Sequence, residues 1–153
     1  MTITSTARPN ETILKDPRWP EIFADSFYWI ALANPADTSH RRALEFSQTI
    51  ADSLLVTTDE VLSEFLNYFS AAGEQKRRVV GIMVEEAMNN SLIIVVPQTR
   101  DSLLSGFALY KARDDKRYSL TDCISMTTMR QRSIDKVLTH DHHFEQEGFT
   151  LLL

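Results

Sequence analysis

Four acidic residues lie at the ends of predicted β-strands or near the starts of predicted helices. Asp25 ends the run EIFAD, and Asp141 comes directly after VLTH. Glu64 lies in the first turns of the helix expected after LLVT, and Asp122 lies in the first turn of a helix that begins near Ser119. Sites in open α/β sheets form beyond the carboxyl ends of the strands. We therefore expect these carboxylates at one rim of a sheet.

Carboxylates gathered at one edge repel one another unless a cation lies among them. Mg²⁺ or Mn²⁺ suits such a cluster, because both are hard ions that take oxygen ligands. One or two such ions activate a water molecule and stabilise charge on a phosphodiester during in-line displacement. The sequence thus predicts a Mg²⁺ or Mn²⁺ site with hydrolytic chemistry, whose ligands are Asp25, Glu64, Asp122 and Asp141.

Each of these acids also has a purely structural interpretation. Asp25 and Asp141 lie where helix N-caps belong, and the segment from Ser119 to Asp122 resembles a capping box. Acids near helix N-termini are stabilised by the helix dipole without any catalytic duty. Capping explains each acid singly, but it does not explain why mutually repelling groups gather at one rim.

Two neighbouring acids compete with Glu64 for the second position. Thr57 followed by Glu60 resembles a capping box, which gives Glu60 a structural task. Asp59 lies near the helix start, where the dipole favours a negative charge. At about 100° per residue, Glu64 lies beside the apolar stripe of this helix, whereas Glu60 lies further out. This geometry favours Glu64 but leaves the choice open.

The elements that must position these acids alternate between short strands and helices. Continuous apolar character at 92–96 is typical of a strand covered on both faces. Strands separated by helices need crossover connections, so we predict one α/β domain, an α/β/α sandwich around a mainly parallel sheet of about five strands. Strands are expected at 21–24, 54–57, 92–96, 137–139 and 149–153, and helices at 26–33, 38–52, 58–72, 74–90, 99–113 and 119–132.

The length and the amino-acid composition of the chain are those of one soluble domain. The chain has 153 residues, and its 43% hydrophobic and 24% charged shares are typical of a folded protein. Residues 1–20 are interrupted by prolines and predict a polar arm before a domain at 21–153. A single cysteine, Cys123, excludes an internal disulfide, and its apolar neighbours predict a core position.

Charge and hydropathy bound the partners and the compartment. The net charge of −5 gives no general attraction to polyanions, which argues against a passive nucleic-acid coat protein. The same charge is compatible with an enzyme that holds cations in an acidic pocket. We find no signal peptide and no run long enough to span a membrane, so a cytoplasmic location is expected.

Other chemistry-bearing residues lie near the acids. His140, His142 and His143 surround Asp141 and invite a zinc interpretation, but adjacent residues rarely all point at one ion, so solvated or outer-shell histidines are favoured. An HD-type phosphohydrolase is excluded because no aspartate follows Asp141. A basic group precedes Asp122. Most such charges form a solvated face, but this group is a candidate for contacts to RNA phosphates; it comprises Lys111, Arg113, Lys116 and Arg117.

The ordered segments FADSFYWIAL, LLVTTDEVLSEFLNYF, YSLTDCIS and VLTHDHHFEQEGFTLL resemble a PIN domain, and are most similar to the VapC-like ribonuclease toxins of bacteria and archaea. The resemblance runs from about residue 21 to the C-terminus. It implies a Mg²⁺- or Mn²⁺-dependent endoribonuclease that uses metal-activated water. The family's four acids match Asp25, Glu64, Asp122 and Asp141, and Ser26 matches a hydroxyl often found near the metal.

A VapC-like toxin further implies an antitoxin protein as a partner and a homodimeric assembly. The long arm and the acidic net charge are less typical of the family, so the resemblance does not identify the surface that binds RNA. An alternative from another class is a PIN-fold module that binds RNA or protein without cutting. A phosphatase is disfavoured, because the chain has no clear motif for a covalent aspartate.

Overall fold

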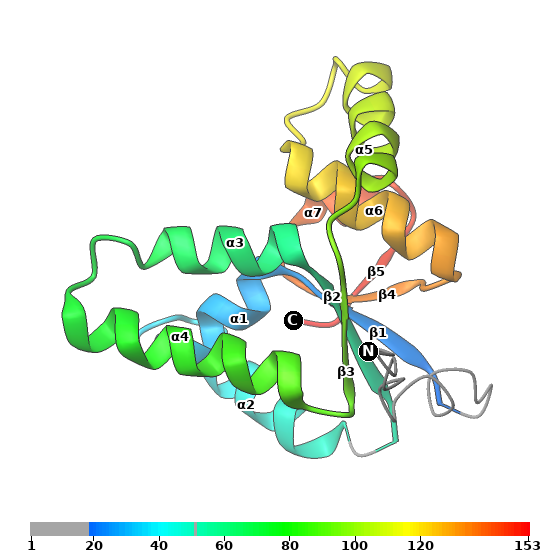
Figure 1. Ribbon diagram of the computed structural model, residues 1–153. Coiled ribbons are helices and arrows are strands. Elements are labelled where there is room, and N and C mark those ends of the chain that lie inside the picture. Colours follow the sequence, from blue (N-terminus) through cyan, green and yellow to red (C-terminus); the bar gives the residue numbers. More distant parts are fainter. Residues whose placement is uncertain (1–18, 51) are drawn as a thin grey trace, which may run out of the picture.

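A computed structural model describes residues 19–50 and 52–153 (Figure 1). All strand pairings in the described sheet are parallel, which confirms the predicted α/β class. The strands are β1 (Glu21–Ala24), β2 (Leu54–Thr58), β3 (Ile93–Val96), β4 (Lys136–Leu138) and β5 (Thr150–Leu151), and the helices are α1 (Ser26–Ala33), α2 (His40–Thr49), α3 (Asp59–Tyr68), α4 (Glu74–Asn89), α5 (Arg100–Ala112), α6 (Leu120–Arg132) and α7 (His142–Gln146).

The sheet order is β3-β2-β1-β4-β5. The chain first moves outward from β1 to β2 and β3, and then returns to β4 on the other side of β1. Because parallel crossovers are right-handed, this reversal puts the later helices on the opposite face of the sheet. In Figure 1, α1 to α4 accordingly lie together on one side, and α5 to α7 gather on the other. In doubly wound sheets, functional sites form at the carboxyl ends of the strands where the order reverses, which here is between β1 and β4.

The central strands and the helices that cover them form one hydrophobic core. Phe23 of β1, Val56 of β2 and Val137 of β4 are fully buried, and so are Phe65 of α3 and Phe144 of α7. Burying a side chain of this size stabilises the fold by about 1.5–3 kcal/mol. The ends of β1 and β4 are therefore held on rigid, well-packed elements.

Helices α5 and α6 approach each other closely at Gly106. A Cβ added there would lie 2.3 Å from Cγ1 of Ile124 and 3.0 Å from its backbone. Only glycine leaves room for this contact, which positions the helix that carries Asp122. Cys123, on the same helix, is fully buried, as predicted for a core residue.

The structure corrects one prediction about burial. The run at 92–96 was expected to be covered on both faces, but β3 is an edge strand that pairs only with β2 in the described sheet. Its residues are half-buried. Sheet order decides the exposure of an apolar strand, and order does not follow from the composition of one strand.

The predicted capping box of Thr57 and Glu60 is also wrong. Helix α3 takes Thr58 as its N-cap, and the Thr58 hydroxyl accepts from the Val61 amide at 3.2 Å. Thr57 lies buried in β2, where its hydroxyl donates to the Ala24 carbonyl at 2.9 Å. The helix therefore starts one residue later than the sequence pattern suggested, and Glu60 has no capping role.

Two further expectations meet the structure differently. The connection after β4, where no helix was expected, contains the short helix α7 (His142–Gln146). The predicted polar arm falls almost entirely on residues 1–18, outside the described part of the chain. No helix among residues 19–50 and 52–153 is long and apolar enough to cross a membrane.

Candidate active site

Asp25 lies at the junction of β1 and α1, and its side chain is 1% exposed. It has the position of an N-cap, but its carboxylate makes no capping hydrogen bond to α1. The Thr139 hydroxyl donates to Oδ2 at 3.0 Å, while Oδ1 is buried without a hydrogen-bond partner among the described residues. Capping therefore does not account for Asp25. A buried carboxylate oxygen that lacks a partner is costly, and a cation is one group that would compensate it.

The surroundings of Asp25 disfavour its charge. Burial, together with the negative charges of Asp122 and Glu64, raises the pKa of this carboxyl from 3.8 to about 7. The Ser26 amide and the Thr139 hydroxyl act in the opposite direction but are outweighed. This pocket therefore disfavours the ionised form of Asp25, and a nearby positive charge would favour it.

Asp122 has both of the roles that the sequence suggested for it, because it belongs to a capping box and also to the acidic cluster. The Ser119 hydroxyl accepts from the Asp122 amide at 3.0 Å, and Asp122 Oδ2 accepts from the Ser119 amide at 2.8 Å. This confirms the predicted capping box and fixes the side chain at the start of α6. Burial raises the pKa of Asp122 despite these bonds, and the charges of Asp141 and Glu64 add to the effect. The cap thus holds a carboxylate beside other carboxylates.

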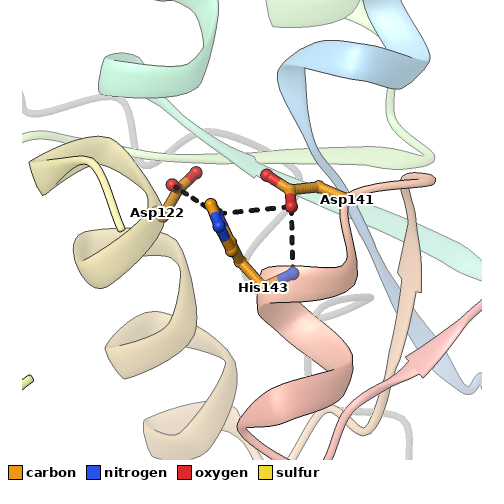
Figure 2. Close-up of side chains that lie close together, drawn as sticks. All are labelled: Asp122, Asp141 and His143. Atoms are coloured by element: carbon orange, nitrogen blue, oxygen red, sulfur yellow. Dashed lines mark hydrogen bonds and ion pairs between the residues drawn. The ribbon is translucent and has the colours of Figure 1, made fainter. Parts of the chain in front are cut away.

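Asp141 and His143 face Asp122 from the start of α7 (Figure 2). Asp141 caps this helix, because its Oδ1 accepts from the His143 amide at 2.9 Å. Nδ1 of His143 lies 3.3 Å from Asp141 Oδ1 and 3.9 Å from Asp122 Oδ2. One donor atom from each of the three residues lies within 4.8 Å of the other two, a spacing that could hold a metal ion.

Thr139 connects the ends of β1 and β4. Its buried hydroxyl donates to Asp25 and accepts from the Asp141 amide at 3.1 Å. Thr139 was not predicted as a site residue, because the sequence assigned it only to the end of the strand at 137–139. A threonine directly before a strand-end acid is the signal that could have indicated it.

Glu64 belongs to the same cluster, since its charge raises the pKa of both Asp25 and Asp122. Asp59 is engaged elsewhere, because its Oδ2 accepts from the Gln98 amide at 2.8 Å. Glu60 is half-buried, and its Oε1 has no hydrogen-bond partner among the described residues. Glu60 and Glu64 both line one surface hollow, with Thr121 on its other side. The structure therefore brings all four predicted acids together and leaves Glu60 as a neighbour.

The three histidines around Asp141 point in different directions. His140 is exposed and packs against Phe27 in a tilted arrangement, with 4.2 Å between ring centroids. His142 is also exposed, and its Nδ1 lies 3.0 Å from Glu145 Oε2. Both are surface groups, as predicted. His143 alone of the three turns toward the carboxylates, a distinction that adjacent identical residues do not reveal in a sequence.

Ser26, the hydroxyl residue next to Asp25, is buried at the first position of α1. The basic group predicted to contact phosphates lies at the end of α5 and in the α5–α6 connection. Lys111, Arg113 and Lys116 line a hollow there together with Tyr118, and Arg117 is exposed. Tyr118 also packs against His143 with ring centroids 5.2 Å apart, so the basic hollow adjoins the acidic cluster.

A buried carboxylate, Glu147, organises the residues behind this hollow. Arg113 Nε donates to Glu147 Oε1 at 2.6 Å, and Arg130 pairs with the other oxygen. The Tyr118 hydroxyl donates to Glu147 Oε1 at 3.2 Å. Burial alone raises the pKa of Glu147, but the two guanidinium groups outweigh it and lower the pKa. Among the four basic residues, Arg113 therefore pairs with a buried carboxylate, and Lys116 pairs with Asp115 at the surface, 3.7 Å away.

Comparisons with known proteins agree with this architecture. The 23S rRNA-specific endonuclease VapC20 of Mycobacterium tuberculosis is 23% identical over 128 residues, which cover 84% of this chain and 95% of the relative. The crystal structure of Mycobacterium tuberculosis VapC20, described as a sarcin-ricin loop cleaving toxin, matches with a TM-score of 0.75 and 23% identity over 84% of this chain and 96% of that one. FitAcB from Neisseria gonorrhoeae matches with a TM-score of 0.62 and 15% identity, over 86% and 96% of the two chains.

The two structural matches establish the fold. Residues 22–149 match the family model of the PIN domain, which is most of the chain and includes the segments that carry the acidic cluster. The protein is a member of the PIN domain family.

Proposed function

We propose that the protein is an endoribonuclease that hydrolyses RNA phosphodiester bonds with a bound Mg²⁺ or Mn²⁺ ion. The observation that carries this proposal is Asp25, a buried carboxylate with one unpartnered oxygen, next to three other acids. Membership of the PIN domain family supports it. So does the similarity to VapC20, whose name describes a 23S rRNA-specific endonuclease.

The residues present fit a hard divalent cation. Asp25, Glu64, Asp122 and Asp141 offer carboxylate oxygens, which are the ligands that Mg²⁺ and Mn²⁺ take in proteins. Asp25 contributes charge that burial otherwise disfavours, and a cation would reverse that cost. When bound, a cation of this kind lowers the pKa of a coordinated water and stabilises charge on a phosphodiester.

The chain's own residues have distinct tasks in this proposal. The Ser119 amide holds one oxygen of Asp122, and the His143 amide holds one oxygen of Asp141, so both side chains stay oriented toward the site. The Thr139 hydroxyl orients Asp25 in the same way. Held by these bonds, the acids need little rearrangement when substrate arrives, and such preorganisation favours catalysis.

The basic hollow next to Tyr118 is the proposed contact for the RNA backbone. An acidic cluster repels phosphates, so cations beside it are needed to hold a polyanion in register. Lys111, Lys116 and Arg117 are exposed there, and we propose that they bind phosphates. Arg113 belongs to the same group but shares its guanidinium with Glu147.

We further propose that the enzyme is the toxin of a toxin–antitoxin pair and acts in the cytoplasm as a homodimer. The similarity to VapC20 supports a toxin, since its crystal structure is described as that of a cleaving toxin. A partner encoded beside this gene should copurify with the protein and suppress its cleavage of RNA. Sedimentation of the purified protein tests the dimer.

The decisive experiment compares wild type with Asp25→Asn in an RNA-cleavage assay with Mn²⁺. We expect the substitution to abolish cleavage, because it removes a charge at the centre of the cluster. Asp101→Asn is the matched control, since Asp101 is an exposed acid in the first turn of α5 and lies outside the cluster. Unchanged cleavage by the Asp25 variant would refute the assignment. A wild-type protein that neither cleaves RNA nor binds Mg²⁺ or Mn²⁺ would instead indicate a binding module.

A further inference from the structure

His143 is placed unlike the other histidines of this chain. Its Nδ1 is buried and forms no hydrogen bond of acceptable geometry with the described residues, although it faces two carboxylates. We propose that His143 supplies a nitrogen ligand, through Nδ1, to the cation held by Asp122 and Asp141, and that this nitrogen biases the site toward Mn²⁺ over Mg²⁺. This inference rests on the proposed function and specifies its metal.

The spacing of the donor atoms suits a shared ion. Ligand atoms about 2.0–2.1 Å from a metal lie roughly 3–3.4 Å from their neighbours in the coordination sphere. Nδ1 of His143 and Oδ1 of Asp141 are already 3.3 Å apart. The 3.9 Å separation of Nδ1 from Asp122 Oδ2 exceeds this range only slightly. Figure 2 shows the imidazole edge turned into the space between the two carboxylates.

The orientation of the imidazole is fixed by its surroundings. Its backbone amide is held by Asp141 at the start of α7, and its ring packs against Tyr118. The Tyr118 hydroxyl in turn donates to Glu147, which Arg113 and Arg130 hold in place. Outer contacts of this kind orient metal-binding side chains and tune their affinity. Nδ1 is therefore presented to the site without a large rearrangement of the side chain.

A second and independent observation indicates a cation at this place. Asp25 is 1% exposed, and Oδ1 of its carboxylate is buried without a partner among residues 19–50 and 52–153. The Thr139 hydroxyl donates to Asp25 Oδ2 and accepts from the Asp141 amide, so this carboxylate is linked directly to the segment that carries Asp141 and His143. The unpartnered oxygen and the unpartnered nitrogen thus lie in neighbouring parts of one acidic site, where bound positive charge would favour both.

A nitrogen ligand changes which metal the site prefers. Mg²⁺ favours oxygen ligands and keeps several of its waters, whereas imidazole suits transition ions. A site built only of carboxylates distinguishes Mn²⁺ from Mg²⁺ weakly. Adding the imidazole of His143 stabilises Mn²⁺ selectively, so removing it should cost Mn²⁺ affinity and leave Mg²⁺ affinity nearly unchanged.

The test measures binding of Mn²⁺ and of Mg²⁺ to metal-free protein by calorimetry, for wild type, His143→Ala and His142→Ala. His142 is the matched control, because it is an adjacent histidine on the same helix whose side chain is 80% exposed. We expect His143→Ala to weaken Mn²⁺ binding by at least about tenfold and Mg²⁺ binding by less than about threefold. We expect His142→Ala to change neither.

Pulsed electron paramagnetic resonance of Mn²⁺ bound to wild type tests the nitrogen directly and needs no variant to fold. Modulation from a coordinated ¹⁴N, replaced by that of ¹⁵N after histidine labelling, supports the inference. Mn²⁺ bound without a nitrogen signal overturns it but leaves the proposed nuclease intact. Equal losses of Mn²⁺ and Mg²⁺ affinity in His143→Ala also overturn it. If wild type binds neither ion, the metal-dependent function itself fails.

Discussion

Asp25→Asn should stabilise the metal-free protein while abolishing its activity. Asparagine has nearly the shape of aspartate. In wild type the Thr139 hydroxyl donates to Asp25 Oδ2 at 3.0 Å, and the amide oxygen of asparagine can accept the same hydrogen bond. The amide nitrogen carries no charge and donates hydrogen bonds, so it suits a position next to the carboxylates of Asp122 and Glu64. The substitution therefore removes an unfavourable buried charge without leaving a cavity.

The magnitude follows from the shifted pKa. The pKa of Asp25 rises from 3.8 to about 7, chiefly through burial. Because the folded protein holds this proton more tightly than the unfolded chain, the stability due to Asp25 is fully present below pH 3.8. It is lost as the pH rises through about 7. At about 1.36 kcal/mol per pH unit, the ionised form costs up to about 4 kcal/mol at pH 8.

Thermal unfolding in the presence of EDTA measures this effect. For a domain of this size, about 4 kcal/mol corresponds to a rise in Tm of roughly 8–16 °C. We expect Asp25→Asn to exceed wild type by up to this amount at pH 8, and the two proteins to unfold at similar temperatures at pH 4. Added Mn²⁺ should stabilise wild type far more than the variant. Equal Tm values at pH 8, or a variant that is less stable at both pH values, would refute the reasoning.

Three further predictions concern individual parts of the structure. Glu64→Gln should lower the RNA-cleavage rate more than about tenfold, as expected for a ligand of the site. Glu60→Gln, on the same helix, should lower this rate less. Equal losses of rate would show that the two acids share the role. Gly106→Ala should destabilise the protein by about 1–3 kcal/mol in urea unfolding, because the new methyl group collides with Ile124, and an unchanged midpoint would contradict this close packing. Glu147→Gln should lower the free energy of unfolding by about 1–3 kcal/mol at pH 7, because two arginines lose their charged partner. This difference from wild type should vanish at a pH acidic enough to protonate Glu147 in wild type as well.

The order of most elements and candidate acids such as Asp25 and Asp122 could be predicted from the sequence, because both depend on short-range patterns. A strand-end aspartate such as Asp25 and a capping box such as that of Ser119 and Asp122 are visible within a few residues. The edge position of β3 was not predictable, because it depends on which strands lie side by side. The predicted start of α3 was wrong by one residue. Thr57 and Thr58 are adjacent threonines, and a sequence pattern does not distinguish which of the two hydroxyls caps the helix.

Contacts between distant segments were beyond the sequence for the same physical reason. Thr139 binds Asp25 across 114 positions of the chain, and only the pairing of β1 with β4 brings them together. The distinction of His143 from His142 depends on the short helix α7, which was not among the expected helices. One residue of helix rotates a side chain by about 100°, which is enough to direct one imidazole to the site and its neighbour to solvent.

Capping and metal binding, which compete as explanations when the sequence is read alone, act together in Asp122 and Asp141. Each uses one carboxylate oxygen to accept from a backbone amide at a helix start, and the bond fixes the side chain on a rigid element. The remaining lone pairs stay available for a ligand. Asp25 differs, because it caps nothing and its burial is costly without a cation. The structural interpretation therefore explains where two of the acids point, but only a site for positive charge explains why the third lies among them.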